Sequence, residues 1–289
     1  MRSEQEMLDL ILETARADER IRAVIMNGSR ANPNAPRDRF QDFDIVYIVT
    51  DVEPFRHNLE WIKRFGELMI LQMPDEMADP PPDNPLGFTY LMQFADGNRI
   101  DLGIDPPAML AEIIKDSQSI LLLDKDGIVP PLPTASDRDY LPPPPTAKAF
   151  ADCCNEFWWV SPYVAKGLWR AEITYARHMQ DHYVRAQLDK MLDWVVGIET
   201  GFACNPGKFG KYVERHLAPE LWGLLLATYA DASYERTWEA LFAMGDLFRI
   251  ISRRVAAHFG FDYPDGDDAR VSAHLRHVRR LPKDAVEIY

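Results

Sequence analysis

The sequence has 289 residues, a formal net charge of −13 and a quarter of its residues charged. This length allows two domains of ordinary size, and the composition is that of a soluble globular protein. The acidic balance argues against a nucleic-acid partner, because phosphate backbones attract basic surfaces, and it favours a cationic partner.

The N-terminal segment predicts a helix over about residues 4–17, in which Ser3 and Glu6 form a capping box. This charged, amphipathic segment is not a signal peptide, and no apolar run approaches the roughly 20 residues that span a bilayer. The three cysteines make neither a disulfide framework nor a zinc motif. We therefore expect a reducing, cytoplasmic setting.

Two strands come next, separated by a loop. Residues 21–26 read as a short buried strand that ends at the Asn-Gly-Ser sequence over 27–29. Two prolines and two asparagines in 31–40 indicate a loop. An unbroken run of β-branched and aromatic residues then predicts a strand from Asp42 to about Thr50.

The second strand carries the first chemical signal. Asp42 and Asp44 share one face of the strand, where two repelling carboxylates are costly unless a cation neutralises them. Hard oxygen ligands suit Mg²⁺. Gly28, Ser29 and Arg30 in the preceding turn could offer backbone N–H groups, a hydroxyl and a charge to a phosphate. Metal-binding carboxylates beside a phosphate-binding turn are what nucleotidyl transfer requires.

The rest of the first half alternates strands and helices. Residues 74–86 are acidic and proline-rich, which indicates a surface excursion. An Asp-Gly pair between two strand-like runs predicts a hairpin. The expected elements are a helix over 54–65, a strand over 67–73, the hairpin strands 88–94 and 98–104, a helix over 106–115 and a strand over 119–123.

Asp101 lies in the middle of the second hairpin strand between apolar neighbours. It is either a site residue or the ion-pair partner of Arg99, which lies on the same face, and Asp105 is a fallback. If this strand pairs beside the Asp42–Thr50 strand, three carboxylates converge. Such a trio could hold two Mg²⁺ ions and accept a proton from an attacking hydroxyl.

Seven prolines between Pro130 and Pro145 mark a stiff linker. We expect domains over 1–135 and 147–289, joined by a linker over 136–146. Strands and helices mix before the linker, and only helical periodicity follows it. The expected helices cover 147–160, 163–181, 183–200, 209–217, 219–229, 233–259 and 267–280.

Four basic residues in the helical half are candidates for a triphosphate contact. Lys208 and Lys211 lie at an expected helix start, in a glycine-containing stretch that lacks the spacing of a P-loop. Lys166 and Arg170 are similar candidates. The alternative for all four is a solvated surface residue.

Glu156 and Trp159 could line a pocket for a polyhydroxylated cation, with a carboxylate for charge and an indole as a flat wall. The alternative is a core helix with aromatic anchors. The seven histidines show no metal-binding spacing, and the cysteines read as buried small hydrophobes.

These motifs carry a family resemblance. Gly28-Ser29, Asp42-x-Asp44 and the later Asp101 resemble the nucleotidyltransferases of the DNA polymerase β superfamily. Several stretches resemble, more narrowly, the aminoglycoside 6-adenylyltransferases, which modify streptomycin. They occur in the same order over nearly the whole chain: NGSRANPN, FQDFDIVYIVTDV, DGNRIDL, LLLDKDG, DCCNEFWWVSPYVAKGLWR, GKFGKY and HVRRLPKDAVEIY.

The resemblance implies an α+β fold: an N-terminal polymerase β-like domain with a mixed sheet and flanking helices, and a C-terminal helical bundle. It implies AMP transfer from Mg²⁺-ATP to the 6-hydroxyl of streptomycin, with release of pyrophosphate. Asp42 and Asp44 match the metal-binding pair, Asp101 the third carboxylate and general base, and Ser29 the phosphate-contacting serine. We expect a monomer or weak dimer.

Two alternatives remain at this point. The same trio could serve a nucleotidyltransferase with a different small-molecule or protein acceptor. A non-catalytic binding module could also keep the fold, although retention of all three carboxylates and of Gly28-Ser29 argues against it.

Overall fold

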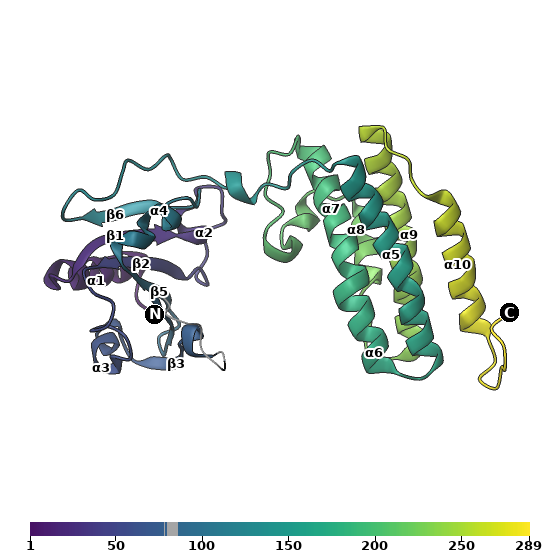
Figure 1. The fold of residues 1–289 in the computed structure, drawn as a ribbon, viewed down its shortest axis with the longest axis horizontal. Coiled ribbons are helices and arrows are strands. Elements are labelled where there is room, and N and C mark those ends of the chain that lie inside the picture. The colour runs from purple at the N-terminus through teal and green to yellow at the C-terminus, as the bar shows by residue number, and fades with distance from the viewer. Residues whose placement is uncertain (78, 80–85) are drawn as a thin grey trace. The chain divides into compact units, whose positions relative to one another are not determined.

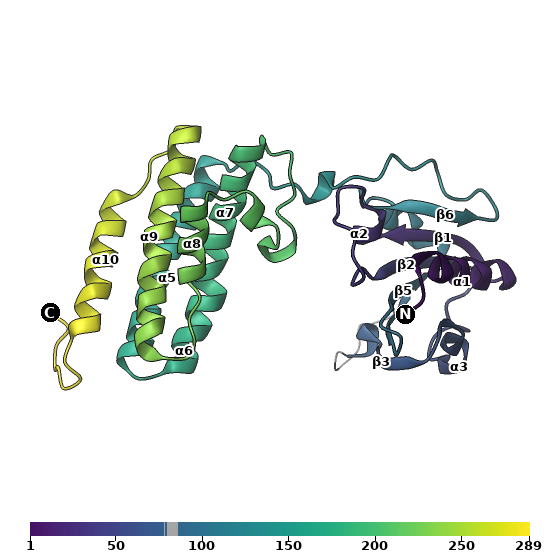
Figure 2. The ribbon, with the colours of Figure 1, turned by 180° about the vertical axis from the view of Figure 1, so that it is seen from behind.

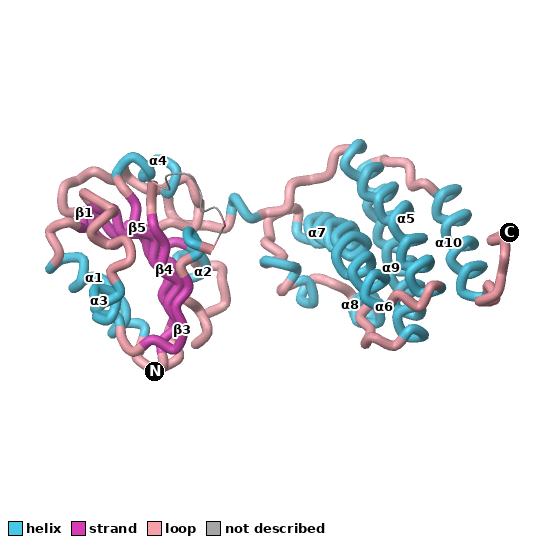
Figure 3. Tube along the Cα trace, turned by 60° about the horizontal axis from the view of Figure 1, so that its bottom comes forward, coloured by secondary structure: helices cyan, strands magenta, loops and turns pink. Residues whose placement is uncertain are grey.

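The computed structural model describes residues 1–77, 79 and 86–289. The chain forms two compact units, Met1–Asp139 and Tyr140–Tyr289, which are called unit 1 and unit 2 below. The division falls inside the linker expected over 136–146, while the domain limits 1–135 and 147–289 stay a prediction. Among the described residues, strands occur in unit 1 alone, and unit 2 consists of helices and loops (Figure 3).

Unit 1 is built on one mixed sheet of six strands in the order β3-β4-β5-β2-β1-β6 (Figure 1). The β2–β5 pair is parallel, and the other neighbouring pairs are antiparallel. The strands are β1 (Ile21–Asn27), β2 (Phe43–Val49), β3 (Leu68–Gln72), β4 (Phe88–Phe94), β5 (Arg99–Asp105) and β6 (Ile120–Asp124). The predicted strands and the hairpin are therefore confirmed, and β2 lies between the second hairpin strand and β1.

Helix α1 (Glu4–Ala17) covers one face of this sheet. Its N-terminus has the predicted capping box between Ser3 and Glu6. Met7 and Ile11 are fully buried in the same cluster as the apolar residues of β2, β4 and β5. The Tyr47 hydroxyl donates a hydrogen bond to the Ile11 carbonyl (2.7 Å). The central strands are thus fixed from this side by a buried, hydrogen-bonded contact.

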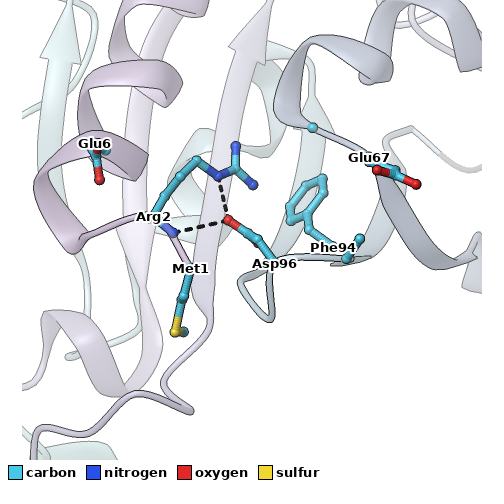
Figure 4. Close-up of a pocket in the computed structure, with 8 residues that line it drawn as sticks. Met1, Arg2, Glu6, Glu67, Phe94 and Asp96 are labelled. Atoms are coloured by element: carbon cyan, nitrogen blue, oxygen red, sulfur yellow. Dashed lines mark hydrogen bonds and ion pairs between the residues drawn. The ribbon is translucent and has the colours of Figure 1, made fainter.

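The N-terminus is fastened to the β4–β5 hairpin (Figure 4). The backbone N–H and Nε of Arg2 both donate to Asp96 Oδ2, at 3.1 and 2.7 Å. The Arg2 guanidinium also lies 5.1 Å from the centre of the Phe94 ring. These bonds hold the pKa of Asp96 well below its usual range. The chain before α1 is therefore tied to the turn that leads into β5.

Two predicted helices of unit 1 are shorter than expected. Instead of a helix over 54–65, the structure has α3 (Leu59–Ile62) and a 3-10 turn over Lys63–Phe65, because His57 takes a positive φ of 58° and Asn58 caps a new start. Instead of a helix over 106–115, a 3-10 turn leads into α4 (Leu110–Ile113). Most of the surface excursion expected over 74–86 lies outside the described residues; its start is a 3-10 turn at Pro74–Glu76.

Unit 2 is a bundle of helices around an apolar core (Figure 2). Phe157 and Phe248 stack at its centre, with ring centroids 3.7 Å apart. Its helices are α5 (Ala147–Trp169), α6 (Ile173–His178), a π-helix (Met179–Val184), α7 (Arg185–Thr200), α8 (Pro219–Ala227), α9 (Tyr234–Phe259) and α10 (Asp265–Arg280). In the described part of the chain, no helix is both long and apolar enough to cross a membrane.

The expected helices of unit 2 differ in three places. The break expected between 181 and 183 is absent, because the π-helix joins α6 directly to α7. Helix α5 continues through Pro162, and the break follows at Ala171, whose φ is 61°. A proline inside an exposed helix costs about 3 kcal/mol through a lost hydrogen bond and a ring clash, and burial of one face of α5 in the core offsets this cost. Residues 209–217 form only two short 3-10 turns, because Gly207 and Phe209 have positive φ angles. The predicted α+β class and the helical second half are confirmed.

Candidate active site

Three carboxylates meet on two neighbouring strands of unit 1. Asp42 precedes β2, Asp44 is its second residue, and Asp101 lies on β5. In the parallel β2–β5 register, Asp44 is paired directly with Asp101. One carboxylate oxygen from each of the three residues lies within 4.8 Å of the others. The structure thus brings together the trio that the sequence singles out.

The electrostatics of this trio favour a bound cation. The pKa of Asp44 is raised to about 7, first by burial and then by the charges of Asp42 and Asp101. A divalent ion would remove this penalty, and three carboxylates are a suitable donor set for a hard cation such as Mg²⁺. The residues present therefore fit the metal that nucleotidyl transfer uses.

Gly28 lies very close to the carboxylate trio. It follows β1, begins the single helical turn α2 (Gly28–Ala31) and has a φ of 71°. A Cβ atom at this position would lie 2.1 Å from Asp44 Oδ2. Only glycine fits both the left-handed backbone and the close approach of the carboxylate. Ser29 follows, and Gln41 Nε2 donates to its carbonyl (3.3 Å) and its hydroxyl (3.4 Å).

Arg30 is buried, with 6% of its surface exposed. Its Nη2 donates to the Gln41 carbonyl (2.6 Å) and its Nε to the Asp42 carbonyl (3.1 Å). Its Nη1 pairs with Glu4 (3.1 Å), and its guanidinium covers the Phe43 ring. All three nitrogens are therefore engaged inside unit 1, whereas the sequence-based expectation is a contact with phosphate. The arrangement fixes the backbone at Asp42.

Arg99 faces the trio from the start of β5. Its Nε and Nη2 donate to the two oxygens of Asp101, at 2.7 and 2.6 Å. The Nε also lies 3.8 Å from Asp42 Oδ2. The sequence offers two alternatives for Asp101, a site residue or the ion-pair partner of Arg99. The structure has both arrangements at once, the ion pair with Arg99 and the convergence with Asp42 and Asp44.

The four basic candidates of unit 2 lie on exposed or partly exposed elements. Lys166 lies over the rings of Tyr163 and Tyr175 near the end of α5, and Arg170 caps that helix. Lys208 and Lys211 flank Phe209, which is 93% exposed. Their contact with a nucleotide stays a prediction.

Glu156 and Trp159 lie on α5, where Glu156 is half-buried and Trp159 is 63% exposed. Neither lines a pocket of about 370 Å³ in unit 2 that lies between α7, α8 and the 207–213 loop. Asp189, Asp193, Trp222 and Tyr229 are among its lining residues.

Asp189 and Asp193 are one helical turn apart on α7. Burial, and then the charge of Asp189, raises the pKa of Asp193 to about 6. Burial also raises the pKa of Asp189, and the nearby Arg185 opposes this rise. Neither residue is among the predicted site residues; the available signal was a pair of acids at i and i+4, each followed or preceded by apolar residues of α7.

A mixed sheet that presents three converging carboxylates beside a glycine turn, joined to a helical unit, defines the class of this protein as a nucleotidyltransferase. Residues 1–278 match the family model described as streptomycin adenylyltransferase, and the chain belongs to that family. The predicted family and the prediction of an adenylyltransferase enzyme are therefore confirmed.

Similar proteins cover nearly the whole chain. The aminoglycoside 6-adenylyltransferase of Bacillus subtilis (strain 168) is 42% identical over 270 residues, which is 93% of this chain and 95% of the relative. That of Campylobacter jejuni is 41% identical over 290 residues, 99% of each chain. A crystal structure of an aminoglycoside 6-adenyltransferase from Bacillus subtilis is 37% identical, covers 97% of this chain and 100% of its own, and has a TM-score of 0.48.

Proposed function

We propose that this protein transfers AMP from Mg²⁺-ATP to the 6-hydroxyl of streptomycin and releases pyrophosphate. The observation that supports this most directly is the convergence of Asp42, Asp44 and Asp101 beside Gly28. It occurs in a member of the streptomycin adenylyltransferase family whose relatives carry the name aminoglycoside 6-adenylyltransferase. The proposal includes a cytoplasmic enzyme that acts as a monomer or weak dimer and has no nucleic-acid partner.

Asp42, Asp44 and Asp101 would hold the metal, as a pair of sites in line with the sequence-based expectation of two Mg²⁺ ions. When bound, Mg²⁺ neutralises phosphate charge and orients the reacting oxygens. Gly28 keeps the turn close to Asp44, and Arg30 holds the Asp42 backbone. Arg30 would thereby position the metal-binding segment, and its contact with phosphate stays a prediction from the sequence.

Asp101 is the proposed general base. It accepts the proton of the acceptor hydroxyl, whose oxygen forms the new bond to the α-phosphorus of ATP while the bond to the pyrophosphate oxygen breaks. Ser29 and the N–H groups of the Gly28 turn would bind phosphate oxygens. Lys166, Arg170, Lys208 and Lys211 are the proposed unit 2 contacts for the nucleotide's negative charge.

The acceptor would be bound through its cationic groups. Glu156 and Trp159 remain the proposed contacts from the sequence. The pocket lined by Asp189 and Asp193 adds a second surface in unit 2, with aromatic walls and two acids against one base, Lys190. Carboxylates bind guanidinium groups through paired hydrogen bonds, and aromatic faces attract cations. The net charge of −13 supports attraction of a polycation at long range.

The test measures transfer of label from ATP to the acceptor and release of pyrophosphate. Streptomycin, spectinomycin, kanamycin and a reaction without acceptor are compared. We expect labelled product and pyrophosphate with streptomycin alone. Transfer to another small molecule or to a protein, and none to streptomycin, would support the alternative of a nucleotidyltransferase with a different acceptor.

A further inference from the structure

The guanidinium of Arg99 lies directly against the carboxylate trio. It binds both oxygens of Asp101 and lies 3.8 Å from an oxygen of Asp42. A cation shared by Asp42, Asp44 and Asp101 needs at least one of the same Asp101 oxygens. Arg99 and a metal ion would therefore share the same Asp101 oxygens, where their two positive charges repel each other.

A comparison with Arg30 shows that Arg99 can leave its position at low cost. Arg30 is buried and bound to two backbone carbonyls and to Glu4. The Arg99 side chain is 44% exposed, and its charged partners among the described residues are carboxylates of the trio itself. Release of Arg99 breaks one partly exposed ion pair, whereas release of Arg30 would break two buried hydrogen bonds and an ion pair.

We infer that Arg99 is an internal counter-ion of the carboxylate trio, which competes with the divalent metal for Asp101 and is released when a triphosphate offers it other oxygens. This inference rests on the proposed function, since it concerns the regulation of the same site. It follows that free metal binds weakly, and that metal and nucleotide bind cooperatively. The planar fork of an arginine suits phosphate as well as carboxylate, so the nucleotide compensates for the contact that Arg99 loses.

The first experiment measures Mn²⁺ binding without nucleotide, by the loss of the free-ion signal in electron paramagnetic resonance. Arg99→Gln removes the competing charge, so we expect it to bind Mn²⁺ about five- to tenfold more tightly than the unaltered protein, the factor expected for loss of one well-aligned ion pair. Arg99→Lys keeps the positive charge but loses the planar guanidinium, so its Mn²⁺ affinity should lie between those of the unaltered protein and Arg99→Gln.

Arg22→Gln is the matched control. Arg22 makes a two-bonded ion pair with Asp126 in the same unit, away from the trio. Its loss should leave Mn²⁺ affinity unchanged. Asp42→Asn should weaken Mn²⁺ binding both alone and in combination with Arg99→Gln, which assigns the bound ion to the trio.

A second measurement uses thermal unfolding. Without metal, Arg99→Gln removes the ion-pair partner of Asp101 and leaves Arg30 as the remaining cation that acts on Asp44, so its melting temperature should fall below that of the unaltered protein. Saturating Mn²⁺ should raise the melting temperature of Arg99→Gln more than that of the unaltered protein. With a non-transferable ATP analogue present, the Mn²⁺ affinities of the two proteins should approach each other.

The outcomes separate the inference from the proposed function. Suppose that Asp42→Asn weakens Mn²⁺ binding but Arg99→Gln binds Mn²⁺ no more tightly than the unaltered protein. The inference is then overturned, and the metal site stands. If Asp42→Asn leaves the Mn²⁺ affinity unchanged, or if no variant binds Mn²⁺, both the metal site and the inference are overturned.

Discussion

Both units bring carboxylates close together, but they assemble them differently. In unit 1, Asp44 and Asp101 come from separate strands and meet through the parallel register. In unit 2, Asp189 and Asp193 lie one turn apart on a single helix beside aromatic rings. Oxygens that converge at short range suit an inorganic ion, whereas a roomy pocket with aromatic walls suits an organic cation. This difference is the basis of our proposal that the chemistry resides in unit 1 and that unit 2 recognises a cationic acceptor.

The largest expected effect is on turnover. Asp42→Asn removes a metal ligand and should lower kcat by about three orders of magnitude, because the charge developing on the phosphate loses its compensation. The fold should persist, since Asp42 lies half-buried at the edge of β2. Pyrophosphate release and the circular dichroism spectrum measure the two properties. Near-normal turnover in this variant would show that the metal assignment is wrong.

Gly28→Ala tests how tightly the unit 1 trio is packed. The added Cβ would displace Asp44, so we expect activity to fall at least about a hundredfold, as small misplacements of reacting groups can cost this much. Gly127→Ala is the control, because Gly127 also has a positive φ (65°) but an added Cβ there meets nothing within 4 Å. It should lose about 1 kcal/mol of stability and keep its activity. If Gly28→Ala and Gly127→Ala lose activity equally, the close approach of Gly28 to Asp44 does not matter for activity.

Asp193→Asn tests the recognition assigned to unit 2. It should raise the KM for a cationic acceptor about tenfold and change kcat less, because the contact is present before and during the reaction. Trp159→Ala tests the alternative acceptor surface, which Glu156 and Trp159 form. A rise in KM with Trp159→Ala and none with Asp193→Asn would favour the Glu156–Trp159 surface as the acceptor site instead.

The smallest expected effect is on pH dependence. Since the pKa of Asp193 is about 6, its negative charge is lost as the pH falls through that value, and the KM for a cationic acceptor should rise below about pH 6. Because this folded-state pKa is raised above 3.8, the same group favours folding at low pH and loses that contribution as the pH rises through 6. Asp193→Asn should remove this part of the KM profile, and an unchanged profile would exclude Asp193 from acceptor binding.

The features of unit 1 that could be predicted from the sequence are those with local signals. The Ser3–Glu6 capping box, the apolar run after Asp42 and the Asp-Gly turn each specify an element by themselves. Once the hairpin and β2 are known, pairing of β5 with β2 is enough to bring Asp101 to Asp44.

The features that could not be predicted depend on distant partners. Arg30 reads as an exposed turn residue until Glu4 and Phe43 fold against it. Pro162 looks like a helix end, but the core contacts of α5 keep the helix continuous. The Asp189–Asp193 pair takes on its character from burial and from Trp222 and Tyr229, which approach from another part of the chain.

The clasp between Arg2 and Asp96 has a practical consequence. Asp96 belongs to the short turn that opens into β5, and Arg99 and Asp101 are the first and third residues of that strand. A bulky group attached beside Arg2 would displace its side chain from Asp96. The β4–β5 hairpin, which carries the proposed base Asp101, would then become more mobile. A purification handle attached beside Arg2 is therefore expected to disturb the proposed active site.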